Sequence, residues 1–180
     1  NNDDFILCYT GNFGYAQGLD RIIDGAKEMQ KINSKIKFLF IGDGPLKESL
    51  CSMVEKDNIS NVTILDSIAR KYLPYVREKA DIAVIPLIND ELFHGAIPSK
   101  IFEALYFRKP ILMSLKGESH DIFIDQARSG VWFDIDSTED FISKTLSLYE
   151  KRTDLDTLGD RGYNFIINNF NRSDLTKEFY

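Results

Sequence analysis

Short apolar runs alternate along this chain with longer amphipathic stretches, and this alternation constrains the fold more than any other feature of the sequence. Several of the runs are apolar on both faces, which is typical of strands in a parallel sheet covered on both sides. Strands are predicted at residues 5–10, 36–41, 62–65, 82–85, 110–114 and 130–133. Helices are predicted at residues 18–32, 45–57, 70–79, 98–107, 119–128 and 138–151.

Repeated alternation of strand and helix predicts an α/β fold, a Rossmann-like doubly wound parallel sheet of about six strands with C-terminal helices. Residues 154–180 predict two of those last helices, broken near residues 168–171 and with Ser173 as a cap. Residues 1–180 suffice for one domain with a sizeable core. In such sheets ligands bind beyond the carboxyl ends of the strands, so the loops that follow the strands are the candidate sites.

Composition excludes several classes of function. The net charge of −6 and the lack of a basic run argue against nucleic acid as a partner. We expect neither a membrane span nor a signal peptide, because no apolar stretch is long enough. Cys8 and Cys51 do not have a metal-ligand spacing, and Cys8 is expected to be a buried hydrophobe. A reducing, cytoplasmic compartment is the simplest interpretation.

The loop after the first strand contains Gly11, Asn12, Gly14 and Gln17. Its glycines either let phosphates approach the backbone or simply form a tight turn, and the spacing alone favours neither. Gly-x-x-Gly-x-x-x-Gly is not the dinucleotide fingerprint, so hydride transfer from NAD is a poor fit.

The second and third loops offer weaker signals. Gly42 and Gly44 form a turn with good turn chemistry, and only their place at the carboxyl edge suggests a ligand. Backbone groups near Ser67 and Ile68 are candidates for reading a base edge, with Ile68 and Leu73 covering its faces. The alternative is that Leu73 belongs to the core.

The fourth loop and its helix are the strongest candidate. Pro98 and Ser99 predict a helix start with Ser99 as the cap, followed by Lys100 and, one turn later, Glu103. A lysine about 4 Å from a phosphate charge contributes ~4 kcal/mol at an effective dielectric of 20. The helix terminus adds roughly half an elementary charge. The alternative is a surface pair of Lys100 and Glu103, which is worth only ~0.2–0.5 kcal/mol.

Two histidines lie in loops on the same edge. His94 is a candidate for reaching the sugar or the leaving group, although loop histidines more often serve packing or face solvent. Glu118 and His120 follow the fifth strand and either line the site or begin a helix. No metal site is predicted from the sequence.

Five motifs in order give the chain a family resemblance. They are Tyr-Thr-Gly-Asn-Phe-Gly-Tyr-Ala-Gln-Gly-Leu, Phe-Leu-Phe-Ile-Gly-Asp-Gly-Pro, Ala-Asp-Ile-Ala-Val-Ile-Pro-Leu, Pro-Ser-Lys-Ile-Phe-Glu-Ala-Leu and Arg-Lys-Pro-Ile-Leu. The set resembles the C-terminal, donor-binding domain of retaining GT-B glycosyltransferases of the group 1 class, also called family 4. It looks most similar to the bacterial subgroup that builds capsule, O-antigen and exopolysaccharide, including L-fucosamine transferase-like members.

The resemblance implies roles for individual residues. Glu103 matches the second Glu of the family's Glu-x7-Glu motif, which binds the nucleotide ribose. Gly95 stands in place of the first Glu, which contacts the donor sugar in many members. Sugar contacts are then expected from the backbone of Gly95, Ala96 and Ile97, or from His94.

The resemblance also indicates which residue binds the diphosphate. Many members bind it with an Arg and a Lys in the first loop, but here Gln17 has the Lys position and no Arg lies between Gly11 and Gly18. Lys100 is therefore expected to be the main cation for the diphosphate.

The expected function is donor binding in a retaining glycosyltransferase that uses a nucleotide-sugar, with a UDP-sugar as substrate and no cofactor. A glycan or lipid-linked acceptor is expected to bind an N-terminal domain outside this chain, so the isolated chain should bind donor weakly and transfer nothing. The full protein is expected in the cytoplasm, with peripheral association at the inner face of the membrane through that domain. The alternatives are half of a non-hydrolysing sugar-nucleotide epimerase and a non-catalytic nucleotide-binding module of a polysaccharide assembly complex.

A phospho-receiver domain is excluded because Asp3 and Asp4 precede the first strand, at its wrong end.

Overall fold

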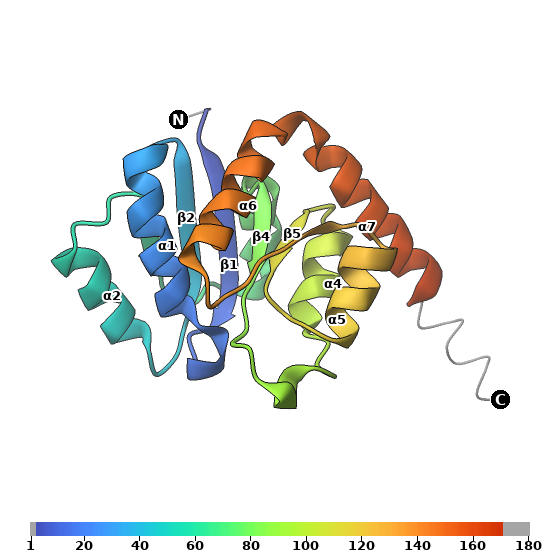
Figure 1. Ribbon diagram of the computed structural model, residues 1–180, viewed down its shortest axis with the longest axis horizontal. Coiled ribbons are helices and arrows are strands. Elements are labelled where there is room, and N and C mark those ends of the chain that lie inside the picture. The colour runs from blue at the N-terminus through green and yellow to red at the C-terminus, as the bar shows by residue number, and fades with distance from the viewer. Residues whose placement is uncertain (1–2, 171–180) are drawn as a thin grey trace.

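The computed structural model describes residues 3–170, and at position 70 it describes the backbone only (Figure 1). Six parallel strands form one sheet in the order β3-β2-β1-β4-β5-β6. The strands are β1 (Phe5–Asn12), β2 (Ile36–Asp43), β3 (Val62–Leu65), β4 (Ile82–Ile85), β5 (Ile111–Met113) and β6 (Gly130–Trp132). The predicted fold class is confirmed, and the strand order reverses between β1 and β4.

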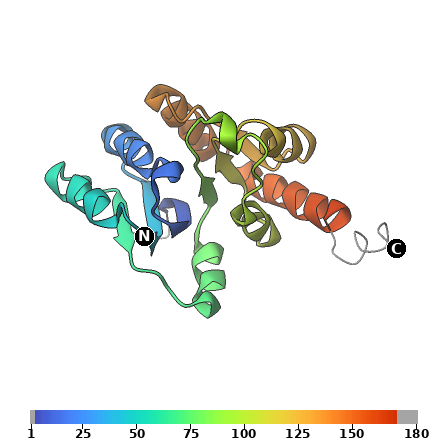
Figure 2. The same ribbon diagram turned by 90° about the horizontal axis from the view of Figure 1, so that it is seen from below.

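Helices connect the strands and cover both faces of the sheet (Figures 1 and 2). They are α1 (Leu19–Ile32), α2 (Lys47–Lys56), α3 (Leu73–Lys79), α4 (Ser99–Tyr106), α5 (Glu118–His120), α6 (Thr138–Glu150) and α7 (Leu155–Asn169). Single 3₁₀ turns lie at Tyr15–Gln17, Arg70–Tyr72, Glu91–Phe93 and Arg152–Asp154. No helix in residues 3–170 is long and apolar enough to cross a membrane.

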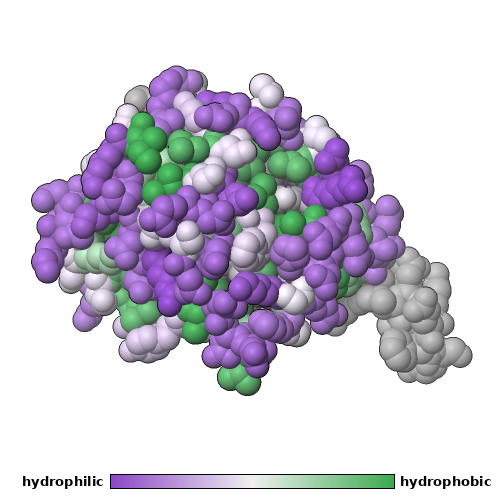
Figure 3. All heavy atoms as spheres, in the orientation of Figure 1, coloured by the Kyte–Doolittle hydropathy of each residue, from purple (hydrophilic) through white to green (hydrophobic). Residues whose placement is uncertain are grey.

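Two hydrophobic cores lie on opposite faces of the sheet. Ile111 and Met113 of β5 face the core that α4 and α7 cover, while Leu112 between them faces the core of α1 and α6. On the face seen in Figure 3, hydrophobic residues form small patches between hydrophilic ones. Most apolar residues of the strands and helices are therefore buried in these two cores, which hold the sheet and its carboxyl edge in place.

The first two strands are longer than predicted. They continue to Asn12 and Asp43, so that Gly11 pairs with Gly42 at the end of the ladder. A Cβ atom built on Gly42 would lie 1.8 Å from the carbonyl oxygen of Gly11. Both glycines thus belong to strand ends rather than to the loops where the sequence placed them, and at Gly42 the neighbouring strand lies too close for a side chain.

The fifth predicted helix is also different. Residues 118–120 form one α-helical turn, and Asp121–Gln126 continue as a π-helix around the buried Phe123. An apolar pattern over so few residues does not distinguish a period of 3.6 from the wider π turn. The second predicted C-terminal helix, with Ser173, lies outside the described residues.

Candidate functional site

A cleft of about 400 Å³ lies at the carboxyl edge of the sheet, between the ends of β1 and β2 and the start of α4, beside the switch point between β1 and β4. Figure 2 looks onto this edge from below. The walls are the ends of β1 and β2, the loop between β3 and α3, and the first turn of α4. Its volume is within the range of pockets that hold small molecules. The lining consists of Thr10, Gly11, Asn12, Ile41, Gly42, Asp43, Ser67, Ile68, Leu73, Ser99, Lys100 and Glu103.

Eight of the predicted site residues meet in this cleft although they come from four separate segments. They are Gly11, Asn12, Gly42, Ile68, Leu73, Ser99, Lys100 and Glu103. Seven others lie outside the lining: Gly14, Gln17, Gly44, His94, Gly95, Ala96 and Ile97. The residues predicted for ribose and base and the phosphate candidates Lys100 and Gly11 thus lie together, while Gly14, Gln17 and the residues predicted for the sugar lie outside the lining.

Lys100 of α4, the helix that follows β4, contacts Tyr9 of β1. Its Nζ donates a hydrogen bond of 2.8 Å to the hydroxyl of Tyr9, and it lies 4.5 Å from the centre of the Tyr9 ring. The Tyr9 hydroxyl in turn donates to the carbonyl of Asn12 over 2.6 Å. Burial lowers the pKa of the Lys100 ammonium, and the charge of Glu103 opposes this shift. Sequence analysis missed Tyr9, since a Tyr in a strand gives no signal of its own.

Gly11 makes room for the lysine. Its φ is 141°, a conformation that residues with a side chain rarely adopt. A Cβ atom on Gly11 would lie 2.4 Å from Cε of Lys100. The glycine signal in the first loop therefore has a specific meaning here, because it lets the ammonium lie against the end of β1.

Glu103 lies one turn after Lys100 but does not pair with it. Its Oε2 instead forms an ion pair with Nη2 of Arg77 in α3. The Arg77 side chain is only 10% exposed, whereas that of Glu103 is 48% exposed. Sequence analysis missed Arg77, and its one signal was its place four residues after Leu73 on the apolar stripe of α3.

The helix start differs in detail from the prediction. Pro98, not Ser99, occupies the N-cap position of α4, and no side chain caps the helix. Ser99 is the first helical residue and lines the cleft together with Lys100. Since the first N–H groups of a helix have no intrahelical acceptor, the start of α4 presents donors at the cleft.

In the first loop, the polar side chain of Gln17 bonds to the backbone of its own turn. The side-chain oxygen of Gln17 accepts a 3.0 Å hydrogen bond from the backbone N–H of Gly14, which closes the turn before α1. Gly44 has a φ of 153° and packs against Asn12 and Phe13. For Gly14, Gln17 and Gly44 the structure therefore favours the turn that the sequence left open.

The loop before α4 packs against the loop after β5. The His94 carbonyl accepts a 2.9 Å hydrogen bond from the N–H of Glu118, and the Ser119 hydroxyl donates to the Ala96 carbonyl over 2.6 Å. The His94 side chain is exposed, and a Cβ on Gly95 would meet nothing within 4 Å.

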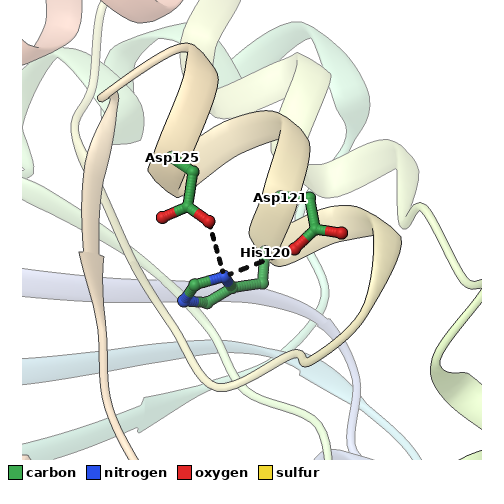
Figure 4. Close-up of side chains that lie close together, drawn as sticks. All are labelled: His120, Asp121 and Asp125. Carbon is green, nitrogen blue, oxygen red and sulfur yellow. Dashed lines mark ion pairs between the residues drawn. The ribbon is translucent and has the colours of Figure 1, made fainter.

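A second polar cluster surrounds His120 at the start of the π-helix (Figure 4). Its Nδ1 lies 3.8 Å from Asp121 and 3.5 Å from Asp125, and the ring packs edge-on against Trp132. These three side chains are close enough together to hold a metal ion, but both carboxylates are exposed and the cluster lies outside the cleft lining.

The cleft therefore combines three kinds of group. The Lys100 ammonium and the N–H groups at the start of α4 attract an anion such as a phosphate. The Glu103 carboxylate accepts hydrogen bonds from hydroxyl groups, and Ile68 and Leu73 offer apolar surface. This combination fits a molecule that carries phosphate, a sugar diol and a flat ring.

Comparison with known proteins identifies the family of the chain. A probable glycosyltransferase, WbjE of Pseudomonas aeruginosa, is 27% identical over 126 residues, which are 69% of this chain and 31% of that protein. The chain spans less than half the length of each of the curated relatives that it matches.

Two solved structures show the same fold. A variant of TarM from S. aureus superposes with a TM-score of 0.83 at 17% identity, over 98% of this chain and 35% of that one. The C-terminal domain of LpcC, a glycosyl transferase group 1 family protein from Francisella tularensis, superposes with a TM-score of 0.72 at 15% identity, over 92% and 86%. The model of the family "Glycosyl transferases group 1" matches residues 1–165, and the chain belongs to this family.

Proposed function

We propose that this chain is the donor-binding half of a retaining glycosyltransferase that moves a sugar from a UDP-sugar to a glycan or lipid-linked acceptor. The observation that carries the proposal is the cleft at the switch point, where Lys100 and Glu103 lie one helical turn apart. The family supports glycosyl transfer, and the TarM structure that shares the fold contains UDP.

In this proposal each wall of the cleft meets one part of the donor. The diphosphate lies against the Lys100 ammonium and the start of α4, where its developing charge is stabilised as the sugar leaves. Glu103 accepts hydrogen bonds from the ribose hydroxyls. The base packs between Ile68 and Leu73, next to the backbone of Ser67.

The partial burial of Lys100 favours this role. An ammonium that has already lost part of its hydration interacts more strongly with a phosphate than an exposed one does. Tyr9 holds the ammonium at the edge of the cleft, so less side-chain freedom is lost on binding.

The remaining parts of the proposal concern the full protein. The acceptor binds an N-terminal domain, and the product is a bacterial surface polysaccharide of the capsule or O-antigen kind, made by a subgroup that includes L-fucosamine transferase-like enzymes. The protein acts in the cytoplasm, at the inner face of the membrane. The isolated chain binds donor weakly and transfers no sugar, which measurable turnover by these 180 residues would disprove.

Calorimetric titration of the chain with UDP and GDP tests donor binding. Lys100→Ala is expected to weaken UDP binding between about 10-fold and 100-fold, the range for losing a hydrogen bond to a charged group. Lys144→Ala, which removes a lysine of α6 outside the cleft, is the matched control and should bind as the parent does. Equal affinity of the parent and Lys100→Ala would show that the diphosphate assignment is wrong.

One observation favours a second function, that of a non-catalytic nucleotide-binding module. Gly95 replaces a carboxylate, lies in open space and is outside the cleft lining, while Gln17 is engaged with Gly14. Tight UDP-sugar binding by the full-length protein without any transfer would favour this alternative.

A further inference from the structure

Arg77 is the one charged residue among the buried side chains that the structure describes. It projects from α3, its guanidinium carbon lies 5.3 Å from the centre of the Phe107 ring, and its Nη2 pairs with Glu103. A guanidinium stays protonated at every pH that a protein survives. Burying this charge is costly unless a partner compensates for it, and Glu103 is that partner.

Arg77 does not itself line the donor cleft. It lies behind Glu103, in the wall of a neighbouring hollow between α4 and α7, while Glu103 lines both spaces. Arg77 also lines a small cavity together with Thr10 and Lys100, which both line the cleft. Among the described residues of the cleft lining, it nevertheless hydrogen-bonds only to Glu103.

The ion pair occupies one side of the carboxylate. It engages Oε2 of Glu103, and none of the described side chains or backbone groups donates a hydrogen bond to Oε1. Glu103 is about half exposed, so an unsupported side chain would sample several rotamers. The buried guanidinium favours the one that pairs with it and leaves Oε1 without a described donor.

The pair also joins two walls of the cleft. Leu73 and Arg77 are four residues apart and lie on the same side of α3, so the helix that presents Leu73 to the base is tied to α4 through Glu103. The ion pair therefore helps to hold the apolar wall at a fixed distance from the Glu103 carboxylate.

We propose that Arg77 is a positioning residue that orients the Glu103 carboxylate for the ribose hydroxyls of the donor. This inference rests on the proposed function of the cleft. It adds a residue that touches no part of the donor, yet sets how well the site distinguishes a ribose with its hydroxyls from one without them.

The test compares UDP with 2′,3′-dideoxy-UDP by calorimetry on the 180-residue chain. The parent is expected to prefer UDP by about 10-fold to 100-fold, because the dideoxy analogue cannot donate to the carboxylate. Glu103→Gln should reduce that preference to about threefold or less, since a neutral amide is a weaker acceptor. Arg77→Met should reduce it to the same extent although Glu103 is still present.

A matched control separates positioning from loosening of the structure. Arg108 also pairs with a carboxylate, that of Asp160, and lies over an aromatic ring, 3.9 Å from the centre of Tyr163. Arg108→Met removes a more exposed pair of an arginine and a carboxylate outside the cleft lining and should keep the parental preference. If Arg77→Met is too unstable to titrate, Arg77→Lys replaces it, since it keeps the charge but loses the planar fork, and its preference should fall between those of the parent and Glu103→Gln.

The outcomes are distinct. A parental preference in Arg77→Met or Arg77→Lys, with both nucleotides weakened equally, would give Arg77 a structural role only and overturn the inference while the proposed function stands. A parent that binds UDP without preferring it over the dideoxy analogue would overturn the ribose role of Glu103 and this inference with it. A parent that does not bind UDP would overturn the proposed function itself.

Discussion

The loops that follow β1 and β4 flank the same switch point but use their polar groups in opposite ways. After β1, Gln17 bonds to the backbone of its own turn. After β4, Lys100 and Glu103 both line the cleft and are supported from behind by Tyr9 and Arg77. One loop is complete without a ligand, and the other has its charged groups fixed beside an open cleft.

The difference shows how a site can shift within a fold. The strand β1 contributes shape, through Gly11, and a hydroxyl that holds the lysine, through Tyr9. The helix α4 contributes charge. In the proposed function, the cation that the family resemblance placed in the first loop comes instead from Lys100 of α4, and Gly11 at the end of β1 leaves room for it.

Among the substitutions that test this contrast between the two loops, Gly11→Ala is expected to have the largest effect. The new Cβ occupies the place of Cε of Lys100, and the φ of 141° is strained for alanine. We expect the free energy of unfolding to fall by about 1–3 kcal/mol. UDP affinity should fall as far as in Lys100→Ala, because the ammonium is displaced. Urea unfolding and calorimetry measure the two effects.

Gly95→Ala is the control for that substitution. Gly95 has no positive φ, and its Cβ would meet open space, so stability should stay within about 0.5 kcal/mol of the parent. Parental UDP binding by Gly11→Ala would mean that Lys100 does not need the place it occupies at the end of β1.

A smaller effect is expected from Gln17→Ala. The N–H of Gly14 loses its acceptor, which should lower the free energy of unfolding by about 0.5–1.5 kcal/mol. UDP affinity should remain that of the parent, because neither residue lines the cleft. The exposed Gln126 provides the control, as Gln126→Ala should change neither quantity. Markedly weaker UDP binding by Gln17→Ala would give the first loop a direct part in the site and erase the contrast between the two loops.

The sequence predicted the architecture well because the information is local. Each strand carries its own apolar run, and the alternation with helices is enough to give the parallel sheet. Cys8 is buried as expected, and that burial raises the pKa of its thiol to about 12. Strand ends were less predictable, since Gly11 and Gly42 look like turn residues until their pairing across the sheet is known.

The candidate site was only partly predictable for the same reason. Lys100 and Glu103 could be singled out because a helix start has a sequence signature. Their supporting residues could not, because Tyr9 and Arg77 are 91 and 26 residues away along the chain and meet them only in the folded sheet. Spacing suggested that Lys100 and Glu103 pair with each other, whereas each is held by a partner from another element.

The smallest expected effect concerns pH and the burial of Lys100. Because burial lowers the pKa of this ammonium, the folded chain releases its proton at a lower pH than the unfolded chain, whose lysine has a pKa near 10.5. Between those two values the unfolded state binds more protons, so this group makes stability rise with pH. The raised pKa values of Cys8 and Tyr9 act in the opposite sense, and both groups remain in Lys100→Met. The stability of the parent relative to Lys100→Met should therefore increase from about pH 7 to about pH 10, as measured by urea unfolding. A constant difference would show that the ammonium keeps its full hydration, and the strong phosphate interaction inferred from its burial would lose its basis.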